Sequence, residues 1–310
     1  MNARIAPVLE IGGTHVSAAF VDLDTRRLTA GSLTRRSLRP EGTAQDILGT
    51  IVRCARSLHA LPGVRWAVAT PGPFDYASGV ALFQDVGKFE ALHGVDVRRT
   101  LTGALPAPDS ICFLNDADAF LLGEWWAGAA RGHDRAVGIT LGTGVGSAFL
   151  ADGAIVDGAP DVPPEGCVNL LTYDGKPLEE TVSRRAIRAA YAAARPADPP
   201  VDVREIADRA RVGDLAAKQV LADALRALGI CLAPWLHRFD ASVLVVGGSM
   251  AASWDLLAEP FYDGLDTLHP RVLARLAVTP ARLPDAAPLI GAALWAAEAG
   301  QPAPTAGSGP

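Results

Sequence analysis

Two stretches of the chain share one pattern: residues 8–20 read VLEIGGTHVSAAF, and residues 138–150 read GITLGTGVGSAFL. Each joins two apolar runs of β type through a turn of glycine and threonine, which predicts a β-hairpin whose turn has no bulky side chains. Such a turn exposes backbone N–H groups and hydroxyls, which suit phosphate oxygens. One such turn is weak evidence. Two of them, a domain's length apart, indicate two half-domains that close on one polyphosphate ligand.

Composition limits the classes of protein to consider. With 310 residues, 49% hydrophobic and 20% charged, the chain is long enough for two domains with well-filled cores. The net charge of -6 argues against a general nucleic-acid surface. No apolar stretch is long enough to span a membrane, and the chain leads directly into a strand without a signal peptide. We therefore expect a cytoplasmic protein with four reduced cysteines, no nucleic-acid partner and no membrane partner.

The order of predicted elements repeats. The first half predicts strands near 5–11, 15–22, 28–34, 64–70 and 110–114, with a helix at about 43–60. The second half predicts strands near 135–141, 145–151, 154–157 and 242–247, with helices at 178–194 and 214–237. Between the predicted strand at 154–157 and the predicted helix at 178–194, residues 158–177 are loop-like, and loops of that length are usually functional. This repeated order predicts a duplicated α/β fold.

Asn115 and Asp116 stand where a buried strand meets a helix. Both residue types cap helix N-termini well, so a capping pair is one interpretation. The other is that Asp116 faces an interdomain cleft as a general base, since phosphoryl transfer needs a carboxylate near the attacking hydroxyl. Asn115 would then orient a sugar hydroxyl. The two interpretations are compatible.

A third glycine turn, Gly247-Gly248-Ser249, follows a strand and precedes a helix. By itself it is an ordinary strand-to-helix turn. As the third member of a set it also predicts a backbone approach to a nucleotide. His15, in the first turn, is a weaker candidate for a phosphate contact.

The chain resembles the ROK family (repressors, uncharacterised frames and sugar kinases), within the superfamily of actin, hexokinase and the heat-shock chaperone ATPases. The similar stretches run in family order: Glu10–Thr14, Ala69–Pro73, Asn115–Phe120, Gly123–Gly132, Leu141–Gly146 and Val246–Ser249. The resemblance implies an actin-like (ribonuclease H-like) fold of two α/β domains with an interdomain cleft. We expect a smaller domain from residues 1–114 plus 288–300, a larger one from 115–287, and a disordered tail at 301–310.

The resemblance also implies roles for individual residues. Asp116 becomes the catalytic base and Asn115 a sugar ligand. The resemblance implies that the first two glycine turns hold the donor phosphates, through Gly12, Gly13, Thr14, Gly142, Thr143 and Gly144. It implies that the third turn lies near the adenosine, and this turn consists of Gly247, Gly248 and Ser249.

Two departures from the family pattern concern the site. The first motif usually begins with an Asp near the magnesium ion, and here it begins with Glu10, one methylene longer. Many members also carry a Glu-x-Gly-His sugar motif and a cysteine-rich zinc loop. Here the histidine is missing and Cys167 is the only cysteine of the loop, so we expect no structural zinc. Glu165 and Glu179 are the candidates for sugar-binding carboxylates, although glutamates at a helix start also favour the helix dipole.

Together these features predict an ATP- and Mg²⁺-dependent sugar kinase of glucokinase type. We expect ATP and a small-molecule sugar as partners, and the resemblance implies a homo-oligomer, namely a dimer. The competing prediction is a catalytically degenerate sugar or nucleotide sensor of the same fold. A nucleotide hydrolase is less favoured, because the Asn-Asp pair has no purpose without a hydroxyl acceptor. The identity of the sugar, and the choice between ATP and polyphosphate, stay open.

Overall fold

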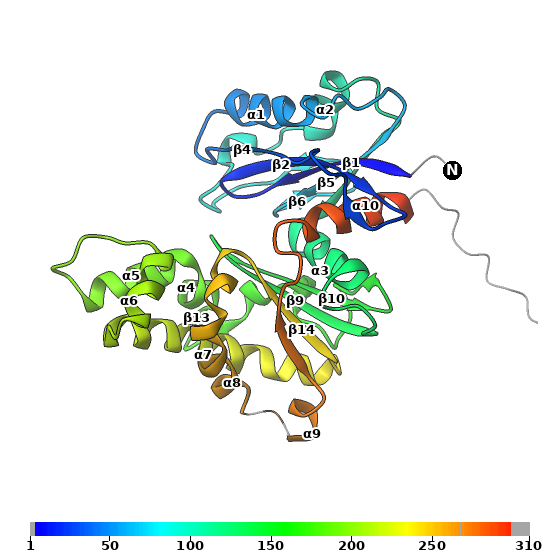
Figure 1. Ribbon diagram of the computed structural model, residues 1–310. Helices are drawn as coiled ribbons and strands as arrows, with labels where there is room; N and C mark the ends of the chain where they lie inside the picture. The colour runs from blue at the N-terminus through cyan, green and yellow to red at the C-terminus, as the bar shows by residue number, and fades with distance from the viewer. Residues whose placement is uncertain (1–3, 267, 269, 299–310) are drawn as a thin grey trace, which may run out of the picture. The chain divides into compact units, whose positions relative to one another are not determined.

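The computed structural model describes residues 4–266, 268 and 270–298. The chain forms two compact units (Figure 1): one contains the residues up to Gly123 together with those from Asp285 onward, and the other runs from Glu124 to Pro284. The predicted domain limits, 1–114 with 288–300 and 115–287, remain a proposal. The predicted disordered tail at 301–310 lies outside the described residues. Across the described part of the chain, no helix combines the length and apolar character needed to cross a membrane.

The first unit contains a six-stranded sheet in the order β3-β2-β1-β5-β8, with β4 paired to β2. β1 and β2 form an antiparallel hairpin, and β1, β5 and β8 run parallel. The strands are β1 (Ile5–Ile11), β2 (His15–Asp22), β3 (Arg27–Leu28), β4 (Thr34–Ser37), β5 (Arg65–Thr70) and β8 (Ser110–Asn115). A small hairpin joins β6 (Phe74–Asp75) to β7 (Val80–Ala81).

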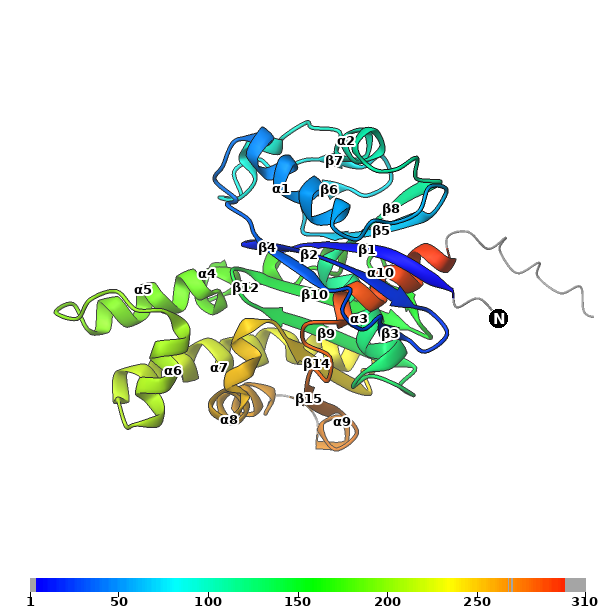
Figure 2. The ribbon, with the colours of Figure 1, turned by 45° about the horizontal axis from the view of Figure 1, so that its top comes forward.

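Helices cover both faces of this sheet. α1 (Ala44–Arg56) lies on one face and α10 (Ala287–Glu298) on the other (Figures 1 and 2). α10 packs on β1, β2, β5 and β8, which is why most of its residues are buried. The remaining elements are a short turn η1 (Glu90–Leu92), α2 (Val97–Ala104), which packs beside α1, and α3 (Asp116–Ala127).

The second unit repeats this topology. Its sheet has the order β11-β10-β9-β14-β15, with β9, β10 and β11 antiparallel and β9, β14 and β15 parallel. The strands are β9 (Arg135–Leu141), β10 (Val145–Ala151), β11 (Ala154–Ile155), β14 (Val243–Gly247) and β15 (Ala277–Pro280). In each unit a hairpin leads into parallel strands in the same order, so the structure bears out the predicted internal duplication.

Helices account for most of the core of the second unit. The long α7 (Leu215–Arg238) and α8 (Trp254–Leu265) pack closely together and against the sheet. α4 (Glu179–Val182), α5 (Arg184–Ala194) and α6 (Val203–Arg211) pack against α7 or its neighbours. The shorter elements are η2 (Pro164–Gly166), η3 (Val168–Leu170), β12 (Thr172–Tyr173), β13 (Lys176–Pro177), η4 (Ser249–Ser253) and α9 (Pro270–Leu273).

Glu124, near the end of α3, is a fully buried carboxylate in the second unit. It accepts backbone N–H groups from Ala129 at 2.6 Å, Leu283 at 2.7 Å and Arg282 at 3.2 Å. Such bonds compensate for the desolvation of a buried charge. The carboxylate therefore joins the end of α3 to the segment that leads back into the first unit.

The middle of α3 crosses α10 at backbone distance. A Cβ atom on Gly291 would lie 1.9 Å from the carbonyl oxygen of Ala119, and one on Gly123 would lie 2.0 Å from that of Ala287. Only glycine allows two helices to approach this closely. The position of α3, whose first residue is Asp116, therefore depends on these two glycines.

Several predicted elements differ from the structure. The strand predicted at 28–34 is two short strands, β3 and β4, separated by a turn in which Gly31 has a φ of 73°. The helix predicted at 178–194 is divided at Ser183, whose side chain caps α5 by accepting the N–H of Ala186. The loop predicted at 158–177 contains η2, η3 and the β12–β13 hairpin. α2, α6 and β15 were not predicted, because their apolar patterns are short.

The glycine crossing can be tested with a matched pair of helical glycines. Gly291→Ala should lower the free energy of unfolding by about 2 kcal/mol or more, because the new methyl group meets backbone. Gly103→Ala in α2 has open space around the new Cβ and should raise it by up to about 1 kcal/mol. Urea unfolding measures both changes, and equal midpoints for the two variants would contradict the crossing.

Candidate active site

Glu10 lies in the central strand β1, two residues before the first glycine turn begins at Gly12. Its cross-strand partner on β2 is Ser17, which is fully buried. Burial raises the pKa of Glu10 from 4.5 to about 7, with the Asp116 carboxylate adding to the rise and Arg35 opposing it. The Oε2 atom of Glu10 is buried and has no hydrogen-bond partner among the described residues. The carboxylate therefore has one oxygen available for a ligand.

A network that sequence reasoning missed surrounds Glu10. Arg35, on the edge strand β4, donates its Nε to Ser17 Oγ at 3.2 Å and its Nη2 to Asp285 at 3.2 Å. Arg35 reaches Ser17 because β4 pairs with β2 in the register that sets these two residues opposite each other. The only signal for this in the sequence would have been the hairpin register that pairs Glu10 with Ser17.

Asn115 and Asp116 stand at the junction of β8 and α3. The Oδ1 atom of Asn115 accepts the N–H groups of Ala117 at 2.9 Å and Asp118 at 3.3 Å, so Asn115 is the helix cap. Its Nδ2 donates to the hydroxyl of Tyr76 at 2.9 Å. The capping interpretation of Asn115 is therefore confirmed. Tyr76, another residue that sequence reasoning missed, fixes the plane of the amide.

Asp116 is half-buried and follows this cap directly. Burial raises the pKa of its carboxyl above 3.8, and the charge of Lys88 is the largest effect in the opposite direction. A carboxylate with a raised pKa at a helix start is well suited to take a proton from a hydroxyl.

The first glycine turn connects β1 to β2. The N–H of Gly12 donates to the carbonyl of His15 at 2.8 Å, which closes the turn. Within the described residues, the N–H groups of Gly13 and Thr14 have no partner, as a phosphate cradle requires. The His15 ring lies against Gly12, where a Cβ would be 3.0 Å away, and burial lowers the pKa of His15.

The second turn, between β9 and β10, is also closed by a backbone hydrogen bond, but between residues two apart instead of three. The N–H of Gly142 donates to the carbonyl of Gly144 at 3.0 Å. Glu179, at the start of α4, lies directly on this turn and accepts the N–H of Val145 at 3.3 Å. A Cβ on Gly144 would be 2.1 Å from Glu179 Oε1, so a larger residue there would displace the Glu179 carboxylate. Glu179 thus lies next to the second turn, a position that the sequence did not predict.

The third turn lies beside the second. β14 runs parallel to β9, and Gly247 is in register with Thr140, so both turns stand at the same end of the sheet. Gly248 has a φ of 83°, and a Cβ there would be 2.3 Å from the carbonyl of Leu141. The structure therefore brings together two of the three predicted nucleotide turns within the second unit.

Glu165 occupies η2 in a left-handed conformation, with a φ of 57°, and its side chain is exposed. The following Gly166 is held by Ser147, whose hydroxyl donates to its carbonyl at 2.6 Å. The same hydroxyl accepts the N–H of Val168 at 2.9 Å. The loop is thus fixed to β10 while the Glu165 carboxylate points outward.

Metal binding at Glu10 is consistent with the buried, unpartnered Oε2 atom. Mg²⁺ usually takes one or two protein carboxylates and completes its shell with water and substrate phosphates. The described residues contain no group of three or more His, Cys, Asp or Glu side chains arranged to hold a metal. A single carboxylate ligand at Glu10 therefore suits a magnesium ion that arrives with a nucleotide.

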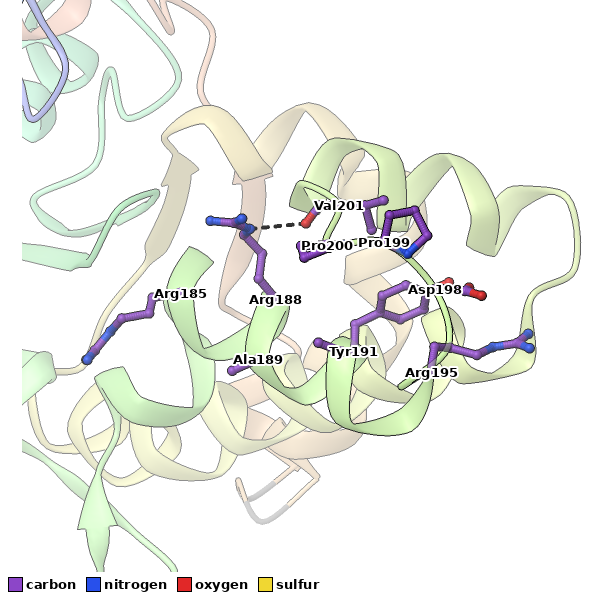
Figure 3. A pocket seen from close by; sticks show the side chains of 10 residues that line it. Arg185, Arg188, Ala189, Tyr191, Arg195, Asp198, Pro199, Pro200 and Val201 are labelled. Atoms are coloured by element: carbon purple, nitrogen blue, oxygen red, sulfur yellow. Dashed lines mark hydrogen bonds between the residues drawn. The ribbon is translucent and has the colours of Figure 1, made fainter.

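A hollow of about 250 Å³ opens beside α5 and is lined by Arg185, Arg188, Tyr191, Pro199 and Val201, among others (Figure 3). Arg188 donates its Nε to the carbonyl of Val201 at 3.1 Å. The lining contains none of the predicted site residues. We therefore do not assign this hollow to the site.

Comparison with known proteins places the chain in a family. The ROK family pattern matches residues 7–299. A glucokinase from Thermotoga maritima is 27% identical over 92% of this chain and 95% of its own length. An N-acetyl-D-glucosamine kinase from Pectobacterium carotovorum is 26% identical over 92% and 96%. Among solved structures, a ROK family glucokinase from Streptomyces griseus in complex with glucose and AMPPNP superimposes on this chain with a TM-score of 0.73. The match covers 95% of this chain and 99% of that one, at 24% sequence identity.

The fold is the duplicated, actin-like architecture of two α/β domains that these structures share. Within that class, the chain belongs to the ROK family. The family and fold inferred from the sequence motifs are confirmed.

The pKa of Glu10 predicts how stability depends on pH in buffer with EDTA. The pKa is about 7 in the folded chain and 4.5 as the ordinary value, so the folded state holds the proton more tightly. This contribution to stability is complete below pH 4.5 and is lost as the pH rises to about 7. Glu10→Gln removes this titration. The melting temperature of the variant minus that of the parent protein should therefore increase from pH 5 to pH 8. If the two proteins differ in melting temperature by the same amount at pH 5 and at pH 8, the raised pKa of Glu10 is contradicted.

Proposed function

We propose that this protein is an ATP-dependent sugar kinase that phosphorylates a hexose hydroxyl. The observation that carries the proposal is Asp116, a half-buried carboxylate with a raised pKa, set at a helix start beside Asn115. The sugar kinases among its relatives support the same reaction class.

In this proposal, Asp116 accepts the proton of the sugar hydroxyl as that oxygen attacks the γ-phosphorus. The γ-phosphoryl group passes to the sugar oxygen, and ADP leaves with the electrons of the broken P–O bond. Asn115 orients the sugar, since its amide plane is fixed by Tyr76 and by the helix cap. Glu165 and Glu179 are the proposed carboxylate ligands of the other sugar hydroxyls.

For the donor, we propose that backbone N–H groups of the first two turns bind the phosphates: those of Gly13 and Thr14, and those of Thr143 and Gly144. Gly247, Gly248 and Ser249 would approach the adenosine. Glu10 would hold the Mg²⁺ of the bound nucleotide through its buried Oε2 atom. When bound, that ion neutralises charge on the phosphates as they separate.

The relatives act on different sugars, by name glucose and N-acetyl-D-glucosamine. By analogy with the glucokinase among these relatives, we propose an aldohexose as acceptor, with glucose as the first to test. A cytoplasmic location and a homodimer are also part of the proposal.

One observation favours a second function, a sugar or nucleotide sensor without turnover. A carboxylate at Glu10 whose pKa is about 7 is partly protonated at neutral pH, which weakens its hold on a cation. A protein with this weakness would still bind sugar through Asn115 and the glutamates.

A coupled assay of ADP release distinguishes the two functions. Mg²⁺-ATP is supplied with glucose, mannose, fructose, N-acetylglucosamine or N-acetylmannosamine in turn, and polyphosphate replaces ATP in a parallel series with direct detection of the sugar phosphate. We expect sugar-dependent turnover that Asp116→Asn lowers about 10²- to 10⁴-fold, because the variant cannot accept the proton.

The control is Asp118→Asn, two residues after the proposed base in the same helix turn, which should retain most of the activity. Full turnover in the Asp116→Asn protein would refute the assignment of the base. Sugar-dependent thermal stabilisation without any turnover would refute the kinase and support the sensor.

A further inference from the structure

One hydroxyl group holds the loop that contains Glu165. The Oγ atom of Ser147, a half-buried residue of β10, donates to the carbonyl of Gly166 at 2.6 Å and accepts the N–H of Val168 at 2.9 Å. The hydroxyl thus acts as donor and acceptor at once, and its two partners stand on either side of Cys167. Because both partners are backbone groups, the two bonds fix the path of the loop itself.

The backbone of this loop is in a conformation that needs support. Glu165 has a φ of 57° and a ψ of 21°, and Gly166 has a φ of 67°, so two successive residues are left-handed. A residue with a side chain rarely adopts this conformation, which persists where its surroundings enforce it. The N–H groups of Gly166 and Cys167 donate to the carbonyls of Pro163 at 2.8 Å and Pro164 at 2.9 Å. These local turns shape the loop, but they do not attach it to the sheet.

Packing adds to the attachment that Ser147 provides. Val168 is fully buried and belongs to the core of the second unit. Both η2 and η3 pack on β10, whereas Glu165 is exposed. The loop therefore presents one exposed carboxylate from a backbone that is anchored at Gly166 and Val168.

The same strand supports the other proposed sugar carboxylate. Glu179 accepts the N–H of Val145 at 3.3 Å, and Val145 stands two residues before Ser147 in β10. β10 begins directly after Gly144, the last glycine of the second turn proposed to bind phosphate. The first residues of one strand therefore set the positions of both carboxylates relative to this turn.

We propose that Ser147 is a positioning residue of the sugar site: its hydroxyl holds the loop so that the Glu165 carboxylate is ready to accept a hydrogen bond from a sugar hydroxyl. The role of Glu165 rests on the proposed kinase function, whereas the anchoring of the loop by Ser147 does not. Without this hydroxyl the loop is less ordered, and binding a sugar must order it again. The loss therefore falls on sugar affinity and not on the transfer step, whose proposed base is Asp116.

The reactivity of Cys167 tests the anchoring without any turnover. Cys167 is a half-buried free thiol, and iodoacetamide labelling of the folded protein is followed by mass spectrometry of its peptide. Ser147→Ala should speed this labelling by about 3- to 10-fold, the factor that one hydrogen bond contributes. Ser147→Thr, which keeps the hydroxyl, should restore the slow rate, and Cys112 in the first unit is the internal reference. An unchanged rate in the Ser147→Ala protein overturns the anchoring.

Ser242→Ala is the matched control. Ser242 is also half-buried, and its hydroxyl also makes two hydrogen bonds, at 3.0 Å each, with the carbonyl of Arg135 and with Nδ1 of His133. The control thus loses two hydrogen bonds of the second unit away from the loop, and Cys167 should react at the parent rate. An acceleration equal to that of Ser147→Ala reflects general loosening and overturns the proposal.

Glucose binding tests the consequence for the sugar site. Ser147→Ala should raise the Kd of glucose in calorimetric titration, and the KM for glucose, by about tenfold with kcat unchanged, the pattern of lost uniform binding. Ser147→Thr should restore both values. Faster labelling of Cys167 with unchanged glucose affinity overturns the positioning role.

The titration needs no turnover, so a protein that binds glucose without phosphorylating it refutes the kinase and still decides the role of Ser147. If the parent protein binds none of the sugars of the assay panel, the kinase and the positioning role both fall. The labelling of Cys167 then decides the anchoring of the loop by itself.

Discussion

The close crossing of α3 and α10 is the constraint on which the site depends. Gly123 and Gly291 let the two helix backbones touch, and this fixes α3 about two turns from its first residue, Asp116. The N-terminus of the same helix is fixed by Asn115, which caps it and is itself held by Tyr76. Its other end carries the buried Glu124, bonded to backbone N–H groups. The Asp116 carboxylate is thus placed by contacts along the whole helix, most of which involve backbone. Backbone contacts are less adjustable than side-chain packing, so the carboxylate has little freedom to move.

The charges of the first unit form a coupled set. Glu10 and Asp116 are carboxylates that burial makes less acidic, and the charge of Asp116 makes the ionisation of Glu10 harder still. A separate cation opposes this for each: Arg35 for Glu10, from the edge strand β4, and Lys88 for Asp116, from the segment between β7 and η1. The Glu at position 10, one methylene longer than the usual Asp, is therefore only one of several features that set the ionisation of the site.

The sequence predicted those features that are local. Apolar runs around a glycine turn specify a hairpin by themselves, so β1–β2 and β9–β10 were predicted at their observed bounds, and so was the strand-to-helix junction at Asn115. Features that depend on distant contacts were not predicted. Arg35 reaches Ser17 only through the pairing of β4 with β2, and Glu179 meets Gly144 only after α4 has packed. The break between α4 and α5 at Ser183 was not predicted, because the apolar residues on both sides of it keep a helical spacing. The roles of Glu165, Glu179 and the glycine turns rest on the family resemblance and remain proposals.

The two pieces of sequence that build the first unit have a consequence for biosynthesis. Its sheet is complete once β8 has been made, but the face covered by α10 stays bare until residues 287–298 leave the ribosome. The second unit is continuous from Glu124 to Pro284, so all of its strands and helices are available earlier than α10. Domains generally fold as units and from the N-terminus during synthesis. In this chain the unit that begins first is finished last, and the nascent protein carries an uncovered apolar sheet face while the whole second unit is translated.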